Sequence, residues 1–159
     1  MKIRIVCTGK LKERFYTEAV GEFMKRLTRY CDPEIIELPD EKVPESPSAA
    51  EIALVKEAEC RRMAEKLSPA DCVIALDPRG KQLTSEEFSA LLASLMVGGK
   101  SRVSFLIGGS HGLTDGVRSR ADEVISFSKM TFPHQIFRIM LLEQIYRAFK
   151  IQSGEPYHK

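Results

Sequence analysis

The sequence predicts an α/β fold, with a mainly parallel sheet and helices on both of its faces. Two observations support this prediction. Short apolar segments alternate with longer amphipathic segments along the whole chain, which is the pattern of strands joined by helical crossovers. Two of the short segments, residues 72–76 (CVIAL) and 103–107 (VSFLI), are almost continuously apolar, as expected of parallel strands buried on both faces.

The composition is that of a globular protein. Of the 159 residues, 43% are hydrophobic and 29% are charged, which excludes a disordered chain. No repeat or domain boundary is visible, so we expect a single domain over residues 1–159. No apolar run approaches the roughly 18 residues of a membrane span, and the four cysteines form no CxxC pair. We therefore expect a cytoplasmic protein with no membrane segment and no metal site.

The basic residues are unevenly distributed. A net charge of +2 excludes a polycation that binds nucleic acid over its whole surface. Basic side chains nevertheless gather at both ends of the chain: Lys2, Arg4, Lys10, Lys12 and Arg14 at the start, and Arg138, Arg147, Lys150, His158 and Lys159 at the end. If the two ends meet in space, they form one basic face for phosphates; the alternative is an ordinary solvated surface.

The first part of the chain predicts a strand followed by a helix. Residues 3–6 form a short strand. From residue 11 the apolar positions recur every four residues, which predicts a helix with a wide apolar face (Phe15, Ala19, Phe23, Leu27). The Asp32-Pro33 pair is expected to end this helix.

A second strand and a capped helix are expected next. Residues 34–38 (EIIEL) form the strand, and residues 39–48, with three prolines, form a loop. Ser48 and Glu51 have the spacing of a capping box, so we expect a helix to begin there. Most of that helix is expected to be exposed.

After the buried strand at residues 72–76, the same alternation continues. Thr84 and Glu87 predict a second capping box and a helix. The apolar strand at residues 103–107 is followed by a short helical stretch around residues 114–121 and by a last strand at residues 123–127.

Residues 133–151 predict the final helix, with Pro133 in its first turn. This helix is apolar almost all round, and we expect a second copy of the chain to cover part of it. Glu143 and Arg147 are four residues apart, so an ion pair along the helix is expected. The alternative is a functional role for Arg147.

Three loops follow the predicted strands at the carboxyl edge of the sheet, where ligands of such folds bind. They comprise residues 77–81, 108–113 and 128–133. The first is expected to be a tight turn; its Gly-Lys pair lacks the upstream glycine and the Ser or Thr of a phosphate-binding loop. The second is not a GxGxxG dinucleotide motif. The third combines hydroxyls with apolar side chains, which suits a purine ring and a thioether.

Taken together, these segments resemble the RlmH family, whose members are SPOUT-class methyltransferases of large-subunit ribosomal RNA. The resemblance extends nearly from end to end. It is carried by the opening strand with its LKE segment, by LDPRGK (76–81), LIGGSHGL (106–113), SFSKMTFPHQIFRIMLLEQIYRAFKI (126–151) and GEPYHK (154–159).

The resemblance implies a SPOUT fold with a C-terminal trefoil knot, a homodimer, and S-adenosylmethionine as cofactor. The substrate it implies is N3 of a pseudouridine in large-subunit (23S) ribosomal RNA, within the assembled ribosome. The residues that it implies for cofactor binding are Leu76, Gly108, Phe127, Ser128, Lys129, Met130, Thr131 and Phe132.

The proton on pseudouridine N3 must leave during methylation, so a base or a stabilising cation is needed. We expect these roles from His158, Tyr157 and Arg147, with Arg4 and Lys129 as RNA contacts. The C-terminal tail, residues 154–159, contains Tyr157 and His158. The alternative to a catalytic role for this tail is that it is a frayed terminus. For the whole protein, the alternatives are a non-enzymatic ribosome-binding factor with a SPOUT fold and a flavodoxin-like nucleotide module.

Overall fold

The computed structural model describes residues 1–158, which contain one five-stranded sheet with the strand order β2-β1-β4-β3-β5. Each adjacent pair of strands is parallel. The strands are β1 (Lys2–Thr8), β2 (Asp32–Leu38), β3 (Cys72–Gln82), β4 (Arg102–Ile107) and β5 (Glu123–Ser126). The parallel sheet that the alternation predicted is confirmed.

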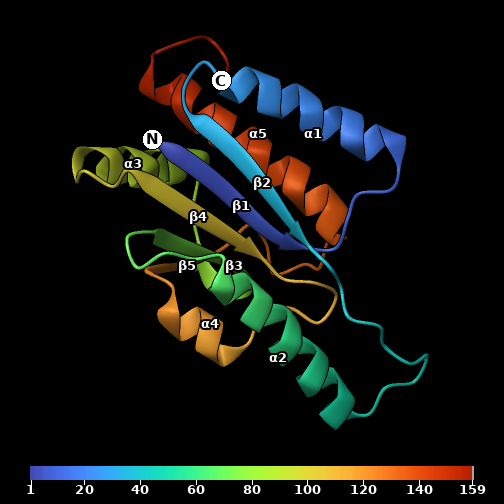
Figure 1. Cartoon of the computed structure of the whole chain (residues 1–159). Coiled ribbons are helices and arrows are strands. Elements are labelled where there is room, and N and C mark those ends of the chain that lie inside the picture. Colours follow the sequence, from blue (N-terminus) through green and yellow to red (C-terminus); the bar gives the residue numbers. More distant parts are fainter. Residues whose placement is uncertain (159) are drawn as a thin grey trace.

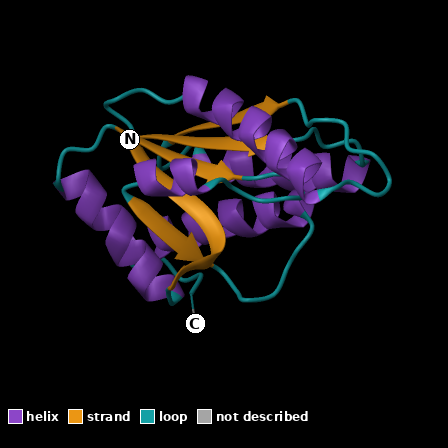
Figure 2. Cartoon of the chain, turned by 90° about the horizontal axis from the view of Figure 1, so that it is seen from below, coloured by secondary structure: helices purple, strands orange, loops and turns teal. Residues whose placement is uncertain are grey.

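Helices lie on both faces of the sheet (Figure 1), as Figure 2 also shows from below, with helices in front of and behind the strands. They are α1 (Arg14–Leu27), α2 (Ala49–Glu65), α3 (Ser85–Val97), α4 (Asp115–Arg120) and α5 (His134–Gln152). One hydrophobic cluster joins the sheet to α1, α3 and α5, and a second joins it to α2 and α4. The predicted α/β class is confirmed, and the trefoil knot stays a prediction.

Both predicted capping boxes are present. The Ser48 side chain accepts a hydrogen bond from the backbone N–H of Glu51, whose carboxylate accepts one from the N–H of Ser48 at 2.7 Å. Thr84 and Glu87 form the same reciprocal pair at the start of α3. Each box depends on residues only three positions apart, which is why the sequence alone located both helix starts.

The Asp32-Pro33 pair does not end the first helix, contrary to the prediction. α1 ends at Leu27, and the two residues begin β2, with Pro33 beside Ile3 of β1. β2 is an edge strand that pairs only with β1. Proline has no backbone N–H to donate, and this is tolerated at an edge because no second strand lies beside Pro33.

The predicted tight turn at residues 77–81 is also wrong. β3 continues to Gln82, with a register shift in its pairing to β5 between Leu76 and Lys81. Gly80 allows β3 to continue beside β5, because any side chain at this position would clash: a Cβ atom there would lie 2.6 Å from the backbone carbonyl carbon of Ile125. The absence of a side chain lets the two backbones approach.

Six of the 19 residues of α5 are buried inside the chain, and most of the others are half-buried. The sheet covers one side, and α1 and α3 pack beside it. Arg138 and Leu141 are completely buried, whereas Ile136 keeps 37% of its surface exposed. The apolar character of α5 is therefore largely explained within one chain, and an exposed stripe near its start consists of Ile136 with the half-buried Ile139 and Met140.

Within residues 1–158, no helix is both long and apolar enough to cross a bilayer.

Candidate functional site

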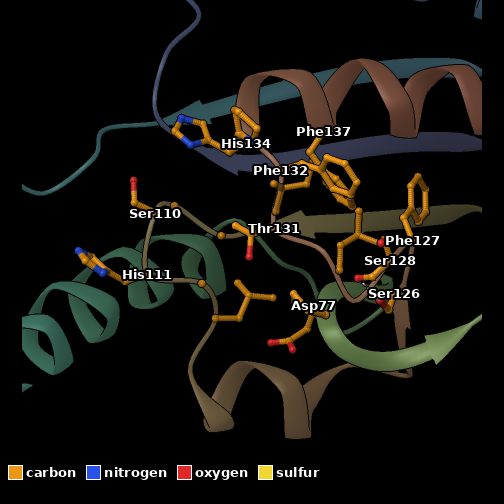
Figure 3. A pocket seen from close by; sticks show the side chains of 18 of the residues that line it. Asp77, Ser110, His111, Ser126, Phe127, Ser128, Thr131, Phe132, His134 and Phe137 are labelled. Atoms are coloured by element: carbon orange, nitrogen blue, oxygen red, sulfur yellow. Dashed lines mark hydrogen bonds between the residues drawn. The ribbon is translucent and has the colours of Figure 1, made fainter.

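A cavity of about 620 Å³ opens at the carboxyl edge of the sheet, between the ends of β3 and β4 and the start of α5 (Figure 3). Its size lies in the range of small-molecule sites, which is about 300 to 1,000 Å³. Loops far apart in sequence build it because parallel strands end at the same edge. All three loops predicted from the sequence contribute to its lining.

The glycine loop after β4 forms one wall. A Cβ atom at Gly108 would lie 2.7 Å from the backbone carbonyl carbon of Gly112, so the chain can fold back on itself only without a side chain there. The N–H of Gly112 donates to the carbonyl of Gly109 at 3.0 Å and closes the turn. Gly112 has a φ of 78°, which other residues rarely adopt.

The loop between β5 and α5 forms the opposite wall. The Ser126 hydroxyl donates to the carbonyl of Ser128 at 2.9 Å, and the Ser128 hydroxyl accepts from the N–H of Met130 at 3.0 Å. The ring centroids of Phe127 and Phe137 lie 5.0 Å apart. The wall therefore combines apolar surface with backbone polar groups, which a planar heterocycle requires.

Asp77 supplies a buried carboxylate to the cavity. Its Oδ2 accepts from Arg118 at 2.9 Å, and its Oδ1 accepts from the side chain of Arg79 at 3.2 Å. Burial opposes its ionisation, but the hydrogen bonds from the two arginines outweigh burial and lower the pKa of Asp77. The side chain is thus a fixed anion. The sequence prediction missed it, although its place directly after a buried strand was a usable signal.

Glu59 of α2 lies behind the glycine loop. Its Oε1 accepts from the N–H of Glu41 at 3.0 Å, and its buried Oε2 has no hydrogen-bond partner within residues 1–158. A Cβ atom at Gly109 would lie 2.7 Å from that Oε2. Burial raises the pKa of Glu59. This side chain thereby connects the proline-rich loop at residues 39–48 to the glycine loop.

Seven of the eight residues that the resemblance implied for cofactor binding line this cavity: Leu76, Gly108, Phe127, Ser128, Met130, Thr131 and Phe132. Lys129 does not line it and is exposed. The lining also includes residues that the sequence did not indicate, among them His134 and Phe137 of α5. Phe137 belongs to the apolar pattern of the last helix, and nothing else in the sequence distinguishes it.

A second cavity, of about 490 Å³, lies along the exposed stripe of α5 and shares Ser126 and Phe127 with the first. Its walls come mainly from α3, α5 and Phe23 of α1. Glu143 of α5 lies on its border.

The structure brings Arg147, Tyr157 and His158 together beside this second cavity. Arg147 binds Glu143 at 2.6 Å, which confirms the predicted ion pair, and the hydroxyl of Tyr157 donates to the same carboxylate at 3.1 Å. Nδ1 of His158 lies 3.3 Å from Nη1 of Arg147, and Nε2 of His158 lies 2.7 Å from Oε1 of Glu86 in α3. Tyr157 and His158 are therefore folded back along α5.

Charges in this cluster fix its protonation. Burial and the neighbouring Glu143 raise the pKa of Tyr157, so its hydroxyl keeps its proton at neutral pH. Glu86 has a pKa of about 2, because its carboxylate accepts from its own backbone N–H and from His158. Tyr157 is thus a donor, and Glu86 is an anion beside the imidazole.

Several basic side chains at the two ends of the chain are engaged in ion pairs, and Lys159 lies outside the described residues. Arg4 is buried, and its guanidinium binds Asp71 at 3.0 Å and Glu34 at 3.3 Å. Arg138 is completely buried within the molecule, and Lys150 binds Glu155 at 2.5 Å. These charges serve ion pairs inside the fold, and the predicted RNA contact of Arg4 stays a prediction.

No cluster of three or more His, Cys, Asp or Glu side chains that could hold a metal ion occurs among the residues that the structure describes.

Comparison with known proteins gives consistent results. Residues 1–158 match the family described as "Predicted SPOUT methyltransferase". Proteins of Bacillus thuringiensis (strain Al Hakam) and Clostridium acetobutylicum, both named Ribosomal RNA large subunit methyltransferase H, are 54% and 52% identical over 159 residues, with 100% of each chain covered. The resemblance to the RlmH family is confirmed.

Two solved structures share the fold. A probable methylase family protein of Haemophilus influenzae Rd KW20 has a TM-score of 0.55 at 16% identity, covering 99% of this chain and 70% of that one. A probable methyltransferase of Bordetella pertussis Tohama I has a TM-score of 0.56 at 15% identity, covering 92% and 95%. The sheet order, the family match and the full-length relatives together show that this chain belongs to the SPOUT methyltransferase family.

Proposed function

We propose that this protein transfers the methyl group of S-adenosylmethionine to N3 of a pseudouridine in large-subunit ribosomal RNA, in the cytoplasm and on the assembled ribosome. The observation that carries the proposal is the single cavity lined by seven of the eight residues that the family resemblance implied for the cofactor. Relatives at 54% and 52% identity are named Ribosomal RNA large subunit methyltransferase H, which supports the choice of substrate.

The cavity fits the chemical groups of this cofactor. The rings of Phe127 and Phe137 and the side chain of Leu76 offer apolar surface to a purine and a thioether. The glycine loop leaves room for close backbone contact, since no side chain can stand at Gly108. When bound, the cofactor supplies an activated methyl group on a sulfonium.

The protein must perform the remaining tasks. It must hold the pseudouridine in line with the methyl group of the cofactor, and it must remove the N3 proton. Arg147 offers a cation for the developing negative charge on the base. We assign the role of general base to the imidazole of His158, since Tyr157 keeps its proton at neutral pH and serves as a donor. Glu143 and Glu86 orient these side chains through the hydrogen bonds described above.

The tail cluster and the first cavity are separate, with the second cavity between them, and a homodimer would join them. A second copy seated along the exposed stripe of α5 would cover Ile136 and the second cavity. The tail of one subunit would then approach the cofactor cavity of the other. Sedimentation equilibrium of the wild type and of Ile136→Glu tests this, because a charge on the stripe should dissociate the dimer.

The function is tested by titrating the protein with S-adenosylmethionine in a calorimeter and then supplying ribosomes as methyl acceptor. We expect saturable binding at one molecule per chain and a methyl group on a single pseudouridine, located by mass spectrometry of the rRNA. A folded protein that binds ribosomes but not the cofactor would instead be the non-enzymatic ribosome-binding factor.

The role of the tail is tested by His158→Ala. We expect a large loss of kcat with cofactor affinity close to that of the wild type, because His158 lies outside the cofactor cavity. Turnover equal to that of the wild type would remove His158 from the mechanism.

A further inference from the structure

The first turn of α1 carries an aromatic ring that the fold does not bury. Phe15 is 63% exposed, although the four-residue spacing placed it on the apolar face that buries Leu27. The ring of Tyr16 lies beside it, with 4.2 Å between the ring centroids. The two rings are tilted by 52° to one another and Tyr16 is only half-exposed, so Phe15 is the ring whose face an unpaired nucleobase can stack on.

The loop that precedes this ring is basic. Lys10 and Lys12 are exposed, and neither forms an ion pair with any residue between 1 and 158. Glu13 is the adjacent acid, and Arg14 is already paired with Glu18 at 2.6 Å. The two lysines are therefore the charges of this segment that remain available to phosphates.

Buried groups fix the shape of this loop. Arg138, which is completely buried, donates to the carbonyl oxygens of Thr8 at 3.0 Å and Gly9 at 2.6 Å, and to Glu37 at 2.6 Å. Glu37 in turn accepts from the N–H of Leu11 at 3.1 Å. The loop is thus ordered before any ligand binds, which lowers the entropic cost of binding.

The loop stands at the mouth of the cofactor cavity. A Cβ atom at Gly9 would lie 3.1 Å from Nε2 of His134, which lines the cavity, and Figure 3 shows the loop after β1 rising beside that histidine. Lys56 lines the cavity and Lys129 stands exposed on the loop before α5, and neither has an ion-pair partner in the part of the chain described. Three segments therefore place lysines on or near this cavity, where Asp77 and Asp40 contribute the opposite charge.

We propose that Lys10, Lys12 and Phe15 form a binding surface for single-stranded RNA, in which the lysines neutralise phosphates and the ring stacks on a base. The proposal rests on the proposed function, because RNA held there passes the mouth of the cofactor cavity. A single strand is specified because the bases of a duplex are already stacked on one another and offer no free face to Phe15.

The charge component is tested by binding a short fluorescein-labelled single-stranded RNA to the full chain at several salt concentrations, followed by anisotropy. The double variant Lys10→Gln/Lys12→Gln should reduce the slope of log affinity against log salt by about 1.4, or about 0.7 for each phosphate that is no longer neutralised. The matched control Lys25→Gln/Lys100→Gln removes the same charge from the last turn of α1 and from the loop before β4. Equal slopes for the two double variants would overturn the proposal.

The stacking component is tested with Phe15→Trp and Phe15→Leu in the same assay. Phe15→Trp keeps an aromatic face and should bind as the wild type does, whereas Phe15→Leu should bind about 5- to 150-fold more weakly. Sedimentation equilibrium is run on both variants. Unchanged RNA affinity together with a changed oligomeric state would show that the ring contacts a second copy of the chain, and would overturn the proposal.

Two further measurements separate this proposal from the proposed function. If the wild type binds RNA through these residues but transfers no methyl group to ribosomes, the proposed function fails and the binding surface stands. If methyl transfer occurs while the variants keep the wild-type RNA affinity and the wild-type KM for ribosomes, the binding surface fails alone.

Discussion

Replacing Gly108 by Ala tests how closely the cofactor cavity depends on backbone packing. The new Cβ atom would lie 2.7 Å from the carbonyl carbon of Gly112 and 2.9 Å from its oxygen. Ordinary contacts begin at 3.4 Å, so the loop must open by about 0.7 Å. The neighbours are backbone atoms, which cannot move aside as a flexible side chain does.

The expected cost follows from this overlap. Overpacking of this kind lowers the free energy of unfolding by about 1 to 3 kcal/mol. The displaced loop also forms a cavity wall, so affinity for S-adenosylmethionine should fall by a similar free energy, or about 5- to 150-fold. Gly21→Ala is the matched control, because no atom lies within 4 Å of its Cβ position in the interior of α1.

Urea denaturation and calorimetric titration measure the two effects. Gly21→Ala should be more stable than the wild type by about 0.5 to 1 kcal/mol, since alanine loses less backbone entropy in a helix, and should bind the cofactor normally. If Gly108→Ala retained both wild-type stability and wild-type affinity, the contact between Gly108 and Gly112 would not shape the site.

Three further predictions concern buried groups. Arg138→Met should lower the free energy of unfolding by about 3 to 5 kcal/mol in urea, because it strips Glu37 and two carbonyls of a buried partner; a loss near zero would contradict this account. Because the pKa of Asp77 is lowered in the folded state, its stabilising contribution is present above its unfolded pKa of about 3.9 and is lost as pH falls below it. The stability difference between the wild type and Asp77→Asn should therefore shrink in acid denaturation series, and a difference that grew with acid would reverse the sign assigned here. Burial raises the pKa of Cys7 to about 11 and of Cys31 to about 12, so both thiols should react slowly with Ellman's reagent at neutral pH until the protein is denatured; fast labelling of the native protein would show that they are accessible thiolates.

Local sequence determined several parts of this protein by itself. The capping boxes at Ser48 and Thr84 involve residues three positions apart, and the continuous apolar runs of β3 and β4 reflect burial on both faces of a parallel sheet. The same parallel order put the three predicted segments at one edge, although residues 77–81 continue β3, so the sequence also located the walls of the cavity. The motifs in those segments, taken together with the opening strand, the last helix and the C-terminal GEPYHK, identified the family.

The errors share one physical cause, which is contact between segments distant in sequence. In the sequence Gly80 indicates a turn, but in the structure it allows the backbone of Ile125 to pack closely against β3. Pro33 likewise indicates the end of a helix, but in the structure it lies in the edge strand β2. Phe15 fits the apolar period of α1, yet the packed core does not reach the first turn of that helix.

The arrangement of charges was decided by tertiary structure alone. Arg138 and Arg4 look like surface basic residues in the sequence, but each is buried against a carboxylate from a distant strand or loop. Arg147, Tyr157 and His158 meet only because the tail folds back along α5. Periodicity records which face of an element is apolar; it carries no information about which distant partner neutralises a charge, because that depends on how the elements pack in three dimensions.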